Sequence, residues 1–177
     1  MKLNTSREAV EMGNTVSHSD FSIAMNAKTF RVLSDGLYEN KIGSIVRELS
    51  SNAADSHIEA GKPDVPFQIH LPNAFEPWFS VKDWGVGLND EEILTVYTSY
   101  FQSTKEQTND MIGAFGLGSK TPFSYRDQFN VISTKDGVTR VYTAYIAENG
   151  MPSIACQVEN ETDEPNGVEV QVSVETA

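Results

Sequence analysis

Apolar residues recur at helical spacing along residues 38–60, the longest periodic segment of the chain. Gly61 and Pro63 follow this segment, and both residue types commonly end helices. Two shorter capped helices are predicted, one after Asn26 and one over residues 89–97, capped by Asn or Asp. The long segment predicts a helix with a buried stripe of Ile42, Ile45, Val46, Leu49 and Ala53.

Alternating apolar and polar residues predict strands in much of the rest of the chain. Residues 129–146 have the pattern of a hairpin, with Asp136-Gly137 as its two-residue turn. Helices and two strands come first, and a strand-rich half follows. This order predicts one α+β domain over residues 1–177, a two-layer fold in which helices cover one face of a mixed β-sheet, after an irregular segment 1–20. The other candidate strands are residues 21–24, 67–71, 78–83, 154–158 and 168–174.

Composition is that of an ordinary folded domain. Of the 177 residues, 39% are hydrophobic and 21% are charged, and no apolar run approaches the roughly 18 residues that a membrane helix needs. The N-terminus has no apolar segment of the secretory type. Cys156 is the only cysteine, which excludes an internal disulfide. These features lead us to expect an intracellular, cytoplasmic protein.

The net charge of −12 is unevenly distributed, because seven acids and no Lys or Arg follow Arg140. Non-specific nucleic-acid binding depends on Lys and Arg, so direct nucleic-acid binding is not expected. A phosphate-bearing ligand would have to be held mainly by backbone N–H groups and a metal ion.

Three polar side chains share one stripe of the predicted long helix. Asn52 lies about 40° from Glu48 around the helix axis, and Asp55 lies about 20° to the other side. A solvated polar face is the alternative explanation. The apolar stripe is centred roughly 90° away, however, so these side chains border the core, where a carboxylate is costly without a partner. The pattern therefore favours a functional role.

The segment V-K-D-W-G-V-G-L at residues 81–88 is a second candidate. A predicted strand ends at Asp83, whose carboxylate can accept a hydrogen bond from a ligand. Gly85 and Gly87 would let the backbone pass close to a flat ligand. An ordinary turn after a strand explains the same residues.

The segment I-G-A-F-G-L-G-S-K-T-P-F at residues 112–123 is the third candidate. Its glycines precede a predicted short helix whose first N–H groups can bind an anion. It is not a P-loop, because Ser119 separates Gly118 from Lys120, and it is not a Rossmann motif, because Thr121 replaces the last glycine. Glycines that merely begin a helix are the alternative.

The three segments follow a fixed order: E-L-x-x-N-A-x-D on a helix, D-x-G-x-G after a strand, a polar loop, and G-x-x-G-x-G. In this order the sequence resembles the GHKL superfamily, the Bergerat-fold ATP-binding domains of gyrase-type topoisomerases, Hsp90-type chaperones, histidine kinases and MutL-type repair proteins. The motifs span about residues 35–135. A narrower resemblance, carried mainly by F-G-L-G-S-K-T-P-F-S-Y at 115–125, is to the rIIA-type lysis-protector proteins of tailed phages.

The resemblance implies a role for each matched residue. Glu48 corresponds to the general base that activates the attacking water, and Asn52 to a Mg²⁺ ligand. Asp83 corresponds to the acceptor of the adenine amino group, and Asp55 to an acid near the nucleotide. The backbone at Gly85 and Gly87 would lie against the base.

The resemblance also implies how the phosphates are held. Residues 99–112 would form the ATP lid, in which Lys105 matches a position that reaches phosphate in some relatives. Lys120 is a second candidate for a phosphate contact, with an ordinary surface lysine as the alternative. The loop that cradles the phosphates would be formed by Gly113, Phe115, Gly116, Leu117, Gly118 and Ser119.

Two departures from the superfamily pattern stand out. Many relatives have a Gly-Thr pair on a late strand, where the Thr supports the adenine-binding Asp, but here Val168 follows Gly167. Water or another hydroxyl would have to support Asp83 in place of that Thr. Gyrase-type and MutL-type relatives also receive a Lys from a following domain, and this chain ends about ten residues after Gly167. We therefore expect a piece of a longer protein, slow hydrolysis, or a partner that completes the site.

The expected function is binding of MgATP with weak ATPase activity, coupled to lid closure or dimerisation. A nucleotide-sensing module that binds a host or phage protein without significant hydrolysis is the alternative. Phosphotransfer of the histidine-kinase type is less favoured, because no helix with a phospho-acceptor His precedes the domain. The phage resemblance implies the cytoplasm of an infected bacterium and leaves peripheral membrane contact open.

Overall fold

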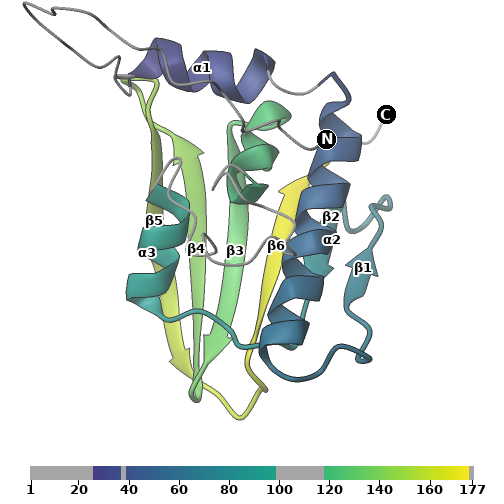
Figure 1. Ribbon diagram of the computed structural model, residues 1–177. Helices are drawn as coiled ribbons and strands as arrows, with labels where there is room; N and C mark the ends of the chain where they lie inside the picture. The colour runs from purple at the N-terminus through teal and green to yellow at the C-terminus, as the bar shows by residue number, and fades with distance from the viewer. Residues whose placement is uncertain (1–25, 37–38, 99–117, 176–177) are drawn as a thin grey trace, which may run out of the picture.

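The computed structural model describes residues 26–36, 39–98 and 118–175. The candidate strand at 21–24, the segment 1–20 and the proposed lid at 99–112 lie outside the described residues. The described chain forms two layers, with helices covering one face of a single sheet (Figure 1). The predicted two-layer α+β fold is therefore confirmed.

Three α-helices and one 3₁₀ helix form the helical layer of the described residues. The predicted caps are correct: Asn26 accepts two backbone N–H groups at the start of the first helix, and Asn89 forms a reciprocal capping box with Glu92. The long helix begins after Asn40, whose side chain accepts the Gly43 N–H. The helices are α1 (Ala27–Gly36), α2 (Lys41–Glu59), α3 (Asp90–Thr98) and the 3₁₀ helix η1 (Gly118–Ser124).

The sheet has the strand order β1-β2-β6-β3-β4-β5. All pairings among the described strands are antiparallel, so the mixed sheet that we expected is an antiparallel one here. Asp136 and Gly137 both have positive φ, at 51° and 79°, as the predicted two-residue hairpin turn requires. The strands are β1 (Gln68–His70), β2 (Trp78–Lys82), β3 (Gln128–Lys135), β4 (Val138–Ile146), β5 (Pro152–Glu161) and β6 (Gly167–Ser173).

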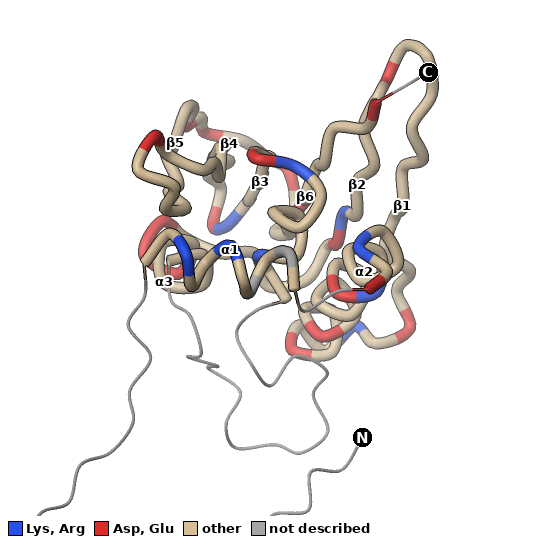
Figure 2. Tube along the Cα trace, turned by 90° about the horizontal axis from the view of Figure 1, so that it is seen from above, with Lys and Arg blue, Asp and Glu red and all other residues tan. Residues whose placement is uncertain are grey.

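The core lies between the two layers. Viewed along the strands, α2 covers the half of the sheet with β1, β2 and β6, and α3 covers the half with β3, β4 and β5 (Figure 2). Ile93 of α3, Val131 of β3 and Tyr142 of β4 have no exposed surface. Ile45, Leu49 and Ala53 of α2 are buried in the same core, and their burial positions the polar stripe of that helix.

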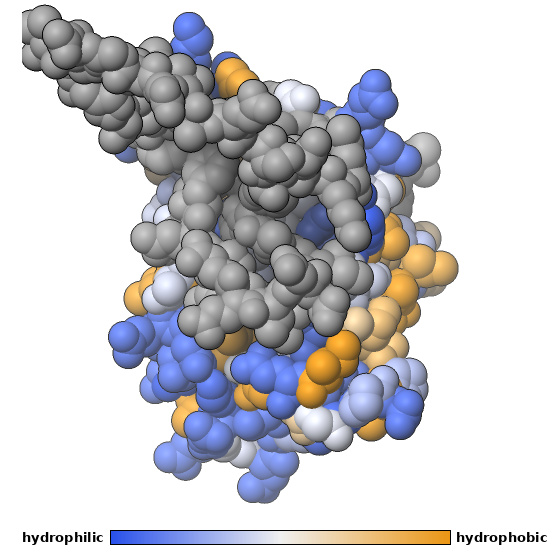
Figure 3. Space-filling model, in the orientation of Figure 1, coloured by the Kyte–Doolittle hydropathy of each residue, from blue (hydrophilic) through white to orange (hydrophobic). Residues whose placement is uncertain are grey.

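Apolar side chains remain exposed on the side of the molecule that carries β1 and α2 (Figure 3). They include Ile58, Val65 and Ile69, whose exposed fractions lie between 41% and 56%. The edge strand β1 is only three residues long, which limits pairing with another chain. Among the described residues, no helix is both long and apolar enough to cross a membrane.

Candidate functional site

Helix α2 brings the first and third candidate segments together. It packs against β2, β6 and η1. The carboxylate of Glu48 faces Gly118, because a Cβ built on that glycine would lie 2.6 Å from Glu48 Oε2. These two residues are 70 positions apart in the sequence, so only the fold makes them neighbours.

The Glu48 side chain is 13% exposed, and its two oxygens have different surroundings. Oε1 accepts two hydrogen bonds from the guanidinium of Arg47, at 2.8 and 3.2 Å. The Arg47 side chain is 65% exposed, so this ion pair is weak and easily exchanged. Oε2 is the oxygen that faces the glycine-rich segment.

Asn52 lies one turn further along α2 and is half-buried, and Asp55 is buried with 6% of its surface exposed. The described residues contain no cluster of three or more His, Cys, Asp or Glu side chains that could hold a metal ion. A single amide oxygen beside a carboxylate does not suit zinc. It does suit Mg²⁺, which takes one or two protein oxygens and completes its shell with phosphate and water.

Asp83 lies at the end of β2 and is 5% exposed. Its Oδ1 accepts hydrogen bonds from the Gly85 N–H at 2.9 Å and the Ser56 hydroxyl at 3.1 Å. Its own N–H donates to the Val168 carbonyl at 2.9 Å. Burial raises the pKa of the Asp83 carboxyl, and the bonds from Gly85 and Ser56 partly offset that rise.

Ser56 and His57, on the last turns of α2, form part of the site that the sequence did not single out. The Trp84 N–H donates to His57 Nε2 at 2.8 Å, so Nδ1 carries the proton and donates to the Val65 carbonyl at 2.7 Å. With both nitrogens engaged by backbone, His57 holds the turn that follows Asp83. The signal available for Ser56 was its position four residues beyond Asn52.

The glycines of D-x-G-x-G are explained by packing within the protein. A Cβ on Gly85 would lie 2.0 Å from Ser56 Oγ and 2.6 Å from the Ser56 backbone. Gly87 has φ +65°, and a Cβ there would lie 2.1 Å from the Thr134 carbonyl oxygen. Contact of these glycines with a nucleotide base stays a prediction.

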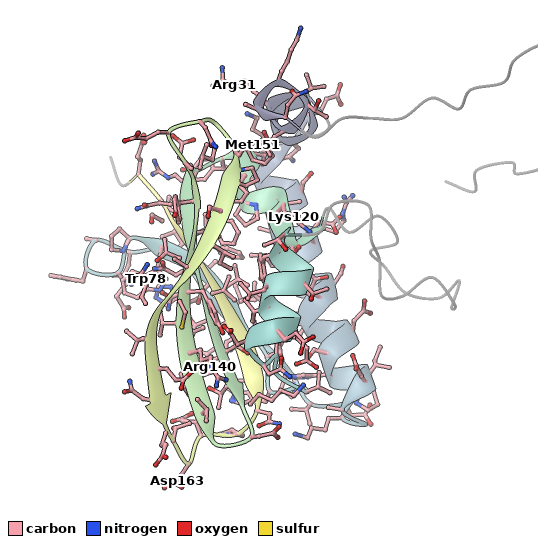
Figure 4. The ribbon with its side chains drawn as sticks, turned by 90° about the vertical axis from the view of Figure 1, so that its left-hand side faces the viewer. Arg31, Trp78, Lys120, Arg140, Met151 and Asp163 are labelled. Atoms are coloured by element: carbon pink, nitrogen blue, oxygen red, sulfur yellow. The ribbon has the colours of Figure 1, made fainter. Side chains whose placement is uncertain are left out.

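The end of the glycine-rich segment is attached to α3. Lys120, labelled in Figure 4 on the helical side of the sheet, is 5% exposed, and its Nζ donates to the Val96 carbonyl at 2.7 Å. Burial lowers its pKa to about 8. It is therefore not an ordinary surface lysine. The other residues predicted to contact phosphate include five that lie outside the described part of the chain: Lys105, Gly113, Phe115, Gly116 and Leu117.

Comparison with solved structures identifies the fold. The ATPase region of Saccharomyces cerevisiae topoisomerase II superimposes with a TM-score of 0.55 at 17% identity, covering 75% of this chain and 38% of that one. The same region bound to ICRF-187 (dexrazoxane) gives the same values. This chain has the GHKL ATPase fold. The order of motifs along the sequence had pointed to that fold, and the prediction is confirmed.

Two curated chaperones are similar to part of this chain. Chaperone protein HtpG from Rickettsia akari (strain Hartford) is 28% identical over 137 residues, and HtpG from Rickettsia typhi (strain ATCC VR-144 / Wilmington) is 28% identical over 138. The alignments cover 65% and 66% of this chain but 22% of each relative. The matched region thus spans about a fifth of the chaperone. No family model matches the sequence.

Proposed function

We propose that this GHKL-fold chain binds MgATP and hydrolyses it slowly. The observation that carries the proposal is that one helix, α2, presents Glu48 to Gly118 at one end and Ser56 to Asp83 at the other. At a rise of 1.5 Å per residue, Glu48 and Ser56 are about 12 Å apart along the axis. That spacing suits a ligand with a flat base at one end and phosphates at the other.

Each residue then has a task that its surroundings support. Asp83 accepts the adenine amino group, and Asn52 holds Mg²⁺, which would neutralise phosphate charge on a chain of net charge −12. Glu48 Oε2 acts as general base on a water beside Gly118. The backbone of Gly118 and Ser119 contacts phosphate, together with the glycine-rich residues before them.

Calorimetric titration with MgATP tests the binding proposal, with Asp83→Asn as the matched variant. Asn keeps the shape and an acceptor for the Gly85 N–H but removes the charged acceptor for adenine. Losing a hydrogen bond to a charged group costs roughly 1.5–3 kcal/mol, which is about a ten- to hundredfold loss of affinity. Absence of wild-type binding at millimolar ATP would contradict the proposal.

Hydrolysis is tested separately by steady-state ATPase assays of the wild type and Glu48→Ala. We expect wild-type turnover to fall to background in the variant while MgATP affinity is retained. Turnover that does not respond to Glu48→Ala would favour the alternative, a nucleotide-sensing module without significant hydrolysis. The pairing of Glu48 Oε1 with Arg47 is the observation that favours this alternative, because it engages half of the carboxylate.

We further propose that the chain is an rIIA-like phage protein acting in the cytoplasm of the infected bacterium, on the strength of residues 115–125. Its nucleotide state would control contact with a host or phage protein or with a second copy of the chain. Light scattering of the purified protein with and without MgATP tests the last of these. A mass that is unchanged by nucleotide would exclude self-association as the response.

A further inference from the structure

Ser56 connects helix α2 to the carboxylate that we assign to adenine. Its Oγ donates to Asp83 Oδ1 at 3.1 Å and accepts the Val86 N–H at 3.2 Å. A serine hydroxyl has one proton, and a backbone N–H can only donate. The direction of both bonds is therefore fixed, and the proton of Ser56 is directed to Asp83.

The two hydrogen bonds that Gly85 and Ser56 give to Asp83 both end on Oδ1. A carboxylate held at one oxygen by two donors cannot rotate freely, so its second oxygen has a defined direction. Oδ2 is then the oxygen that we assign to a ligand N–H, and the Val168 backbone also favours the ionised carboxyl by lowering its pKa. Without the Ser56 bond, Oδ1 would keep the hydrogen bond from the Gly85 N–H.

The neighbouring strand β6 does not supply a hydroxyl to Asp83. Val168 accepts the Asp83 N–H through its carbonyl. Strand alternation places its side chain on the helix-facing side, with the core residues Val170 and Val172, and it packs against that core. The side chain that β6 presents next to Asp83 is thus apolar, and the hydroxyl comes from α2.

We propose that Ser56 is the positioning residue for adenine recognition in this chain. It fixes the Asp83 carboxylate from the same helix that carries Glu48 and Asn52, at spacings of four residues. Base recognition and phosphate chemistry are thereby aligned by one rigid element. This inference rests on the proposed binding of ATP.

The test is calorimetric titration of the full chain with MgATP and, separately, with MgGTP. Ser56→Ala should weaken ATP binding about tenfold, the usual effect of removing a hydrogen bond to a charged group. GTP presents an oxo group where ATP presents the amino donor, so its weaker binding should change little. The control is Ser50→Ala on another face of α2, a residue for which the described structure shows no side-chain hydrogen bond.

A second-site variant separates positioning from simple support of the fold. The double variant Ser56→Ala/Val168→Thr supplies a hydroxyl beside Asp83 from β6 in place of the one lost from α2. It does not replace the side-chain acceptor of the Val86 N–H. If Ser56 has a positioning role, the double variant should regain most of the tenfold ATP affinity lost in Ser56→Ala. Its free energy of unfolding, measured in urea, should stay as low as that of Ser56→Ala. If Ser56→Ala does not fold, Ser56→Cys keeps a side-chain donor, although the S–H group is larger and a weaker donor, and carries the same comparison.

The outcomes are distinct. Equal ATP affinity of the wild type and Ser56→Ala would overturn the inference and leave the proposed function standing. Equal losses for ATP and GTP, with no recovery on adding Val168→Thr, would also overturn it, because Ser56 would then only support the fold. No wild-type binding of ATP would overturn the proposed function itself.

Discussion

Glu48 Oε2 occupies the space next to the Cα of Gly118, at 2.6 Å from where a Cβ on that glycine would lie. The general base that we propose and the glycine-rich segment are thus in direct contact, and the absence of a side chain on Gly118 is what allows it. A methyl group there cannot coexist with the present position of the carboxylate.

Gly118→Ala should therefore reduce ATP turnover by about a hundredfold, because displacements of about 1 Å in a catalytic group have effects of that size. Its free energy of unfolding should change by less than about 1 kcal/mol, since the atom that must move is the end of a flexible side chain. Paired ATPase assays and urea denaturation measure both quantities.

The matched control for this substitution is Gly36→Ala, where a Cβ would meet nothing within 4 Å. It should leave turnover unchanged. A fully active Gly118→Ala protein would show that Glu48 does not depend on this contact. Strong destabilisation would contradict the expectation that only the end of the Glu48 side chain has to move.

Gly87→Ala should destabilise the fold by more than about 3 kcal/mol. The φ of +65° alone costs an alanine roughly 1–2 kcal/mol, and its Cβ would lie 2.1 Å from the backbone oxygen of Thr134, which cannot move aside easily. Gly61 has a similar φ of +70° with open space around it. Gly61→Ala should therefore lose only the roughly 1–2 kcal/mol that an alanine costs at positive φ. Urea denaturation of both variants gives the difference, and equal losses would exclude the clash as the cause.

The sequence predicted the features that depend on local pattern. The caps at Asn26 and Asn89 and the turn at Asp136-Gly137 depend on the conformational preferences of single residues. The apolar stripe predicted for α2 was correct in part: Ile45, Leu49 and Ala53 are buried, whereas Ile42 and Val46 are exposed, because periodicity does not show how much of a helix face its neighbours cover. The order of three short motifs was enough to predict the GHKL fold. Strand direction was not predicted, because it depends on how distant segments pair, and the described sheet is antiparallel where a mixed one was expected.

The parts of the site that the sequence did not give depend on contacts between distant segments. Ser56 and His57 appear as ordinary polar residues at the end of a helix, and only the fold brings them to Asp83 and Trp84. Lys120 could not be distinguished from a surface lysine, because its burial requires α3 and η1 to meet. The roles assigned to all of these residues toward a nucleotide stay predictions.

Lys120 should make stability increase with pH in alkaline solution. Burial lowers its folded-state pKa to about 8, from an ordinary value of 10.5, so the folded chain releases this proton before the unfolded chain does. The cost of burying the charge, on the order of 3 kcal/mol, is therefore present below pH 8 and is relieved between pH 8 and 10.5. Urea denaturation across this range should show the rise in the wild type. The Lys120→Met variant should lack this rise in the free energy of unfolding. The prediction would be contradicted if the free energies of unfolding of the two proteins changed in parallel with pH.

Asp83 should give opposite pH dependences for stability and for ATP binding. Its folded-state pKa is raised above the ordinary 3.8 by burial, so its ionised form costs stability above the raised pKa. Acidification relieves this cost, and it vanishes below 3.8, where folded and unfolded chains are both protonated. The stability advantage of Asp83→Asn over the wild type should therefore shrink as the pH falls.

ATP affinity should change in the other direction, because an ionised Asp83 is the acceptor for the adenine amino group. Burial, together with the Asp83 charge, raises the pKa of the Tyr97 phenol of α3, so this phenol does not titrate in place of Asp83. Wild-type ATP affinity should fall as Asp83 is protonated, while the weak binding of Asp83→Asn should fall only with the protonation of ATP itself. Calorimetry of both proteins over the same buffers gives the difference. Parallel profiles would mean that the carboxylate is not what reads the base.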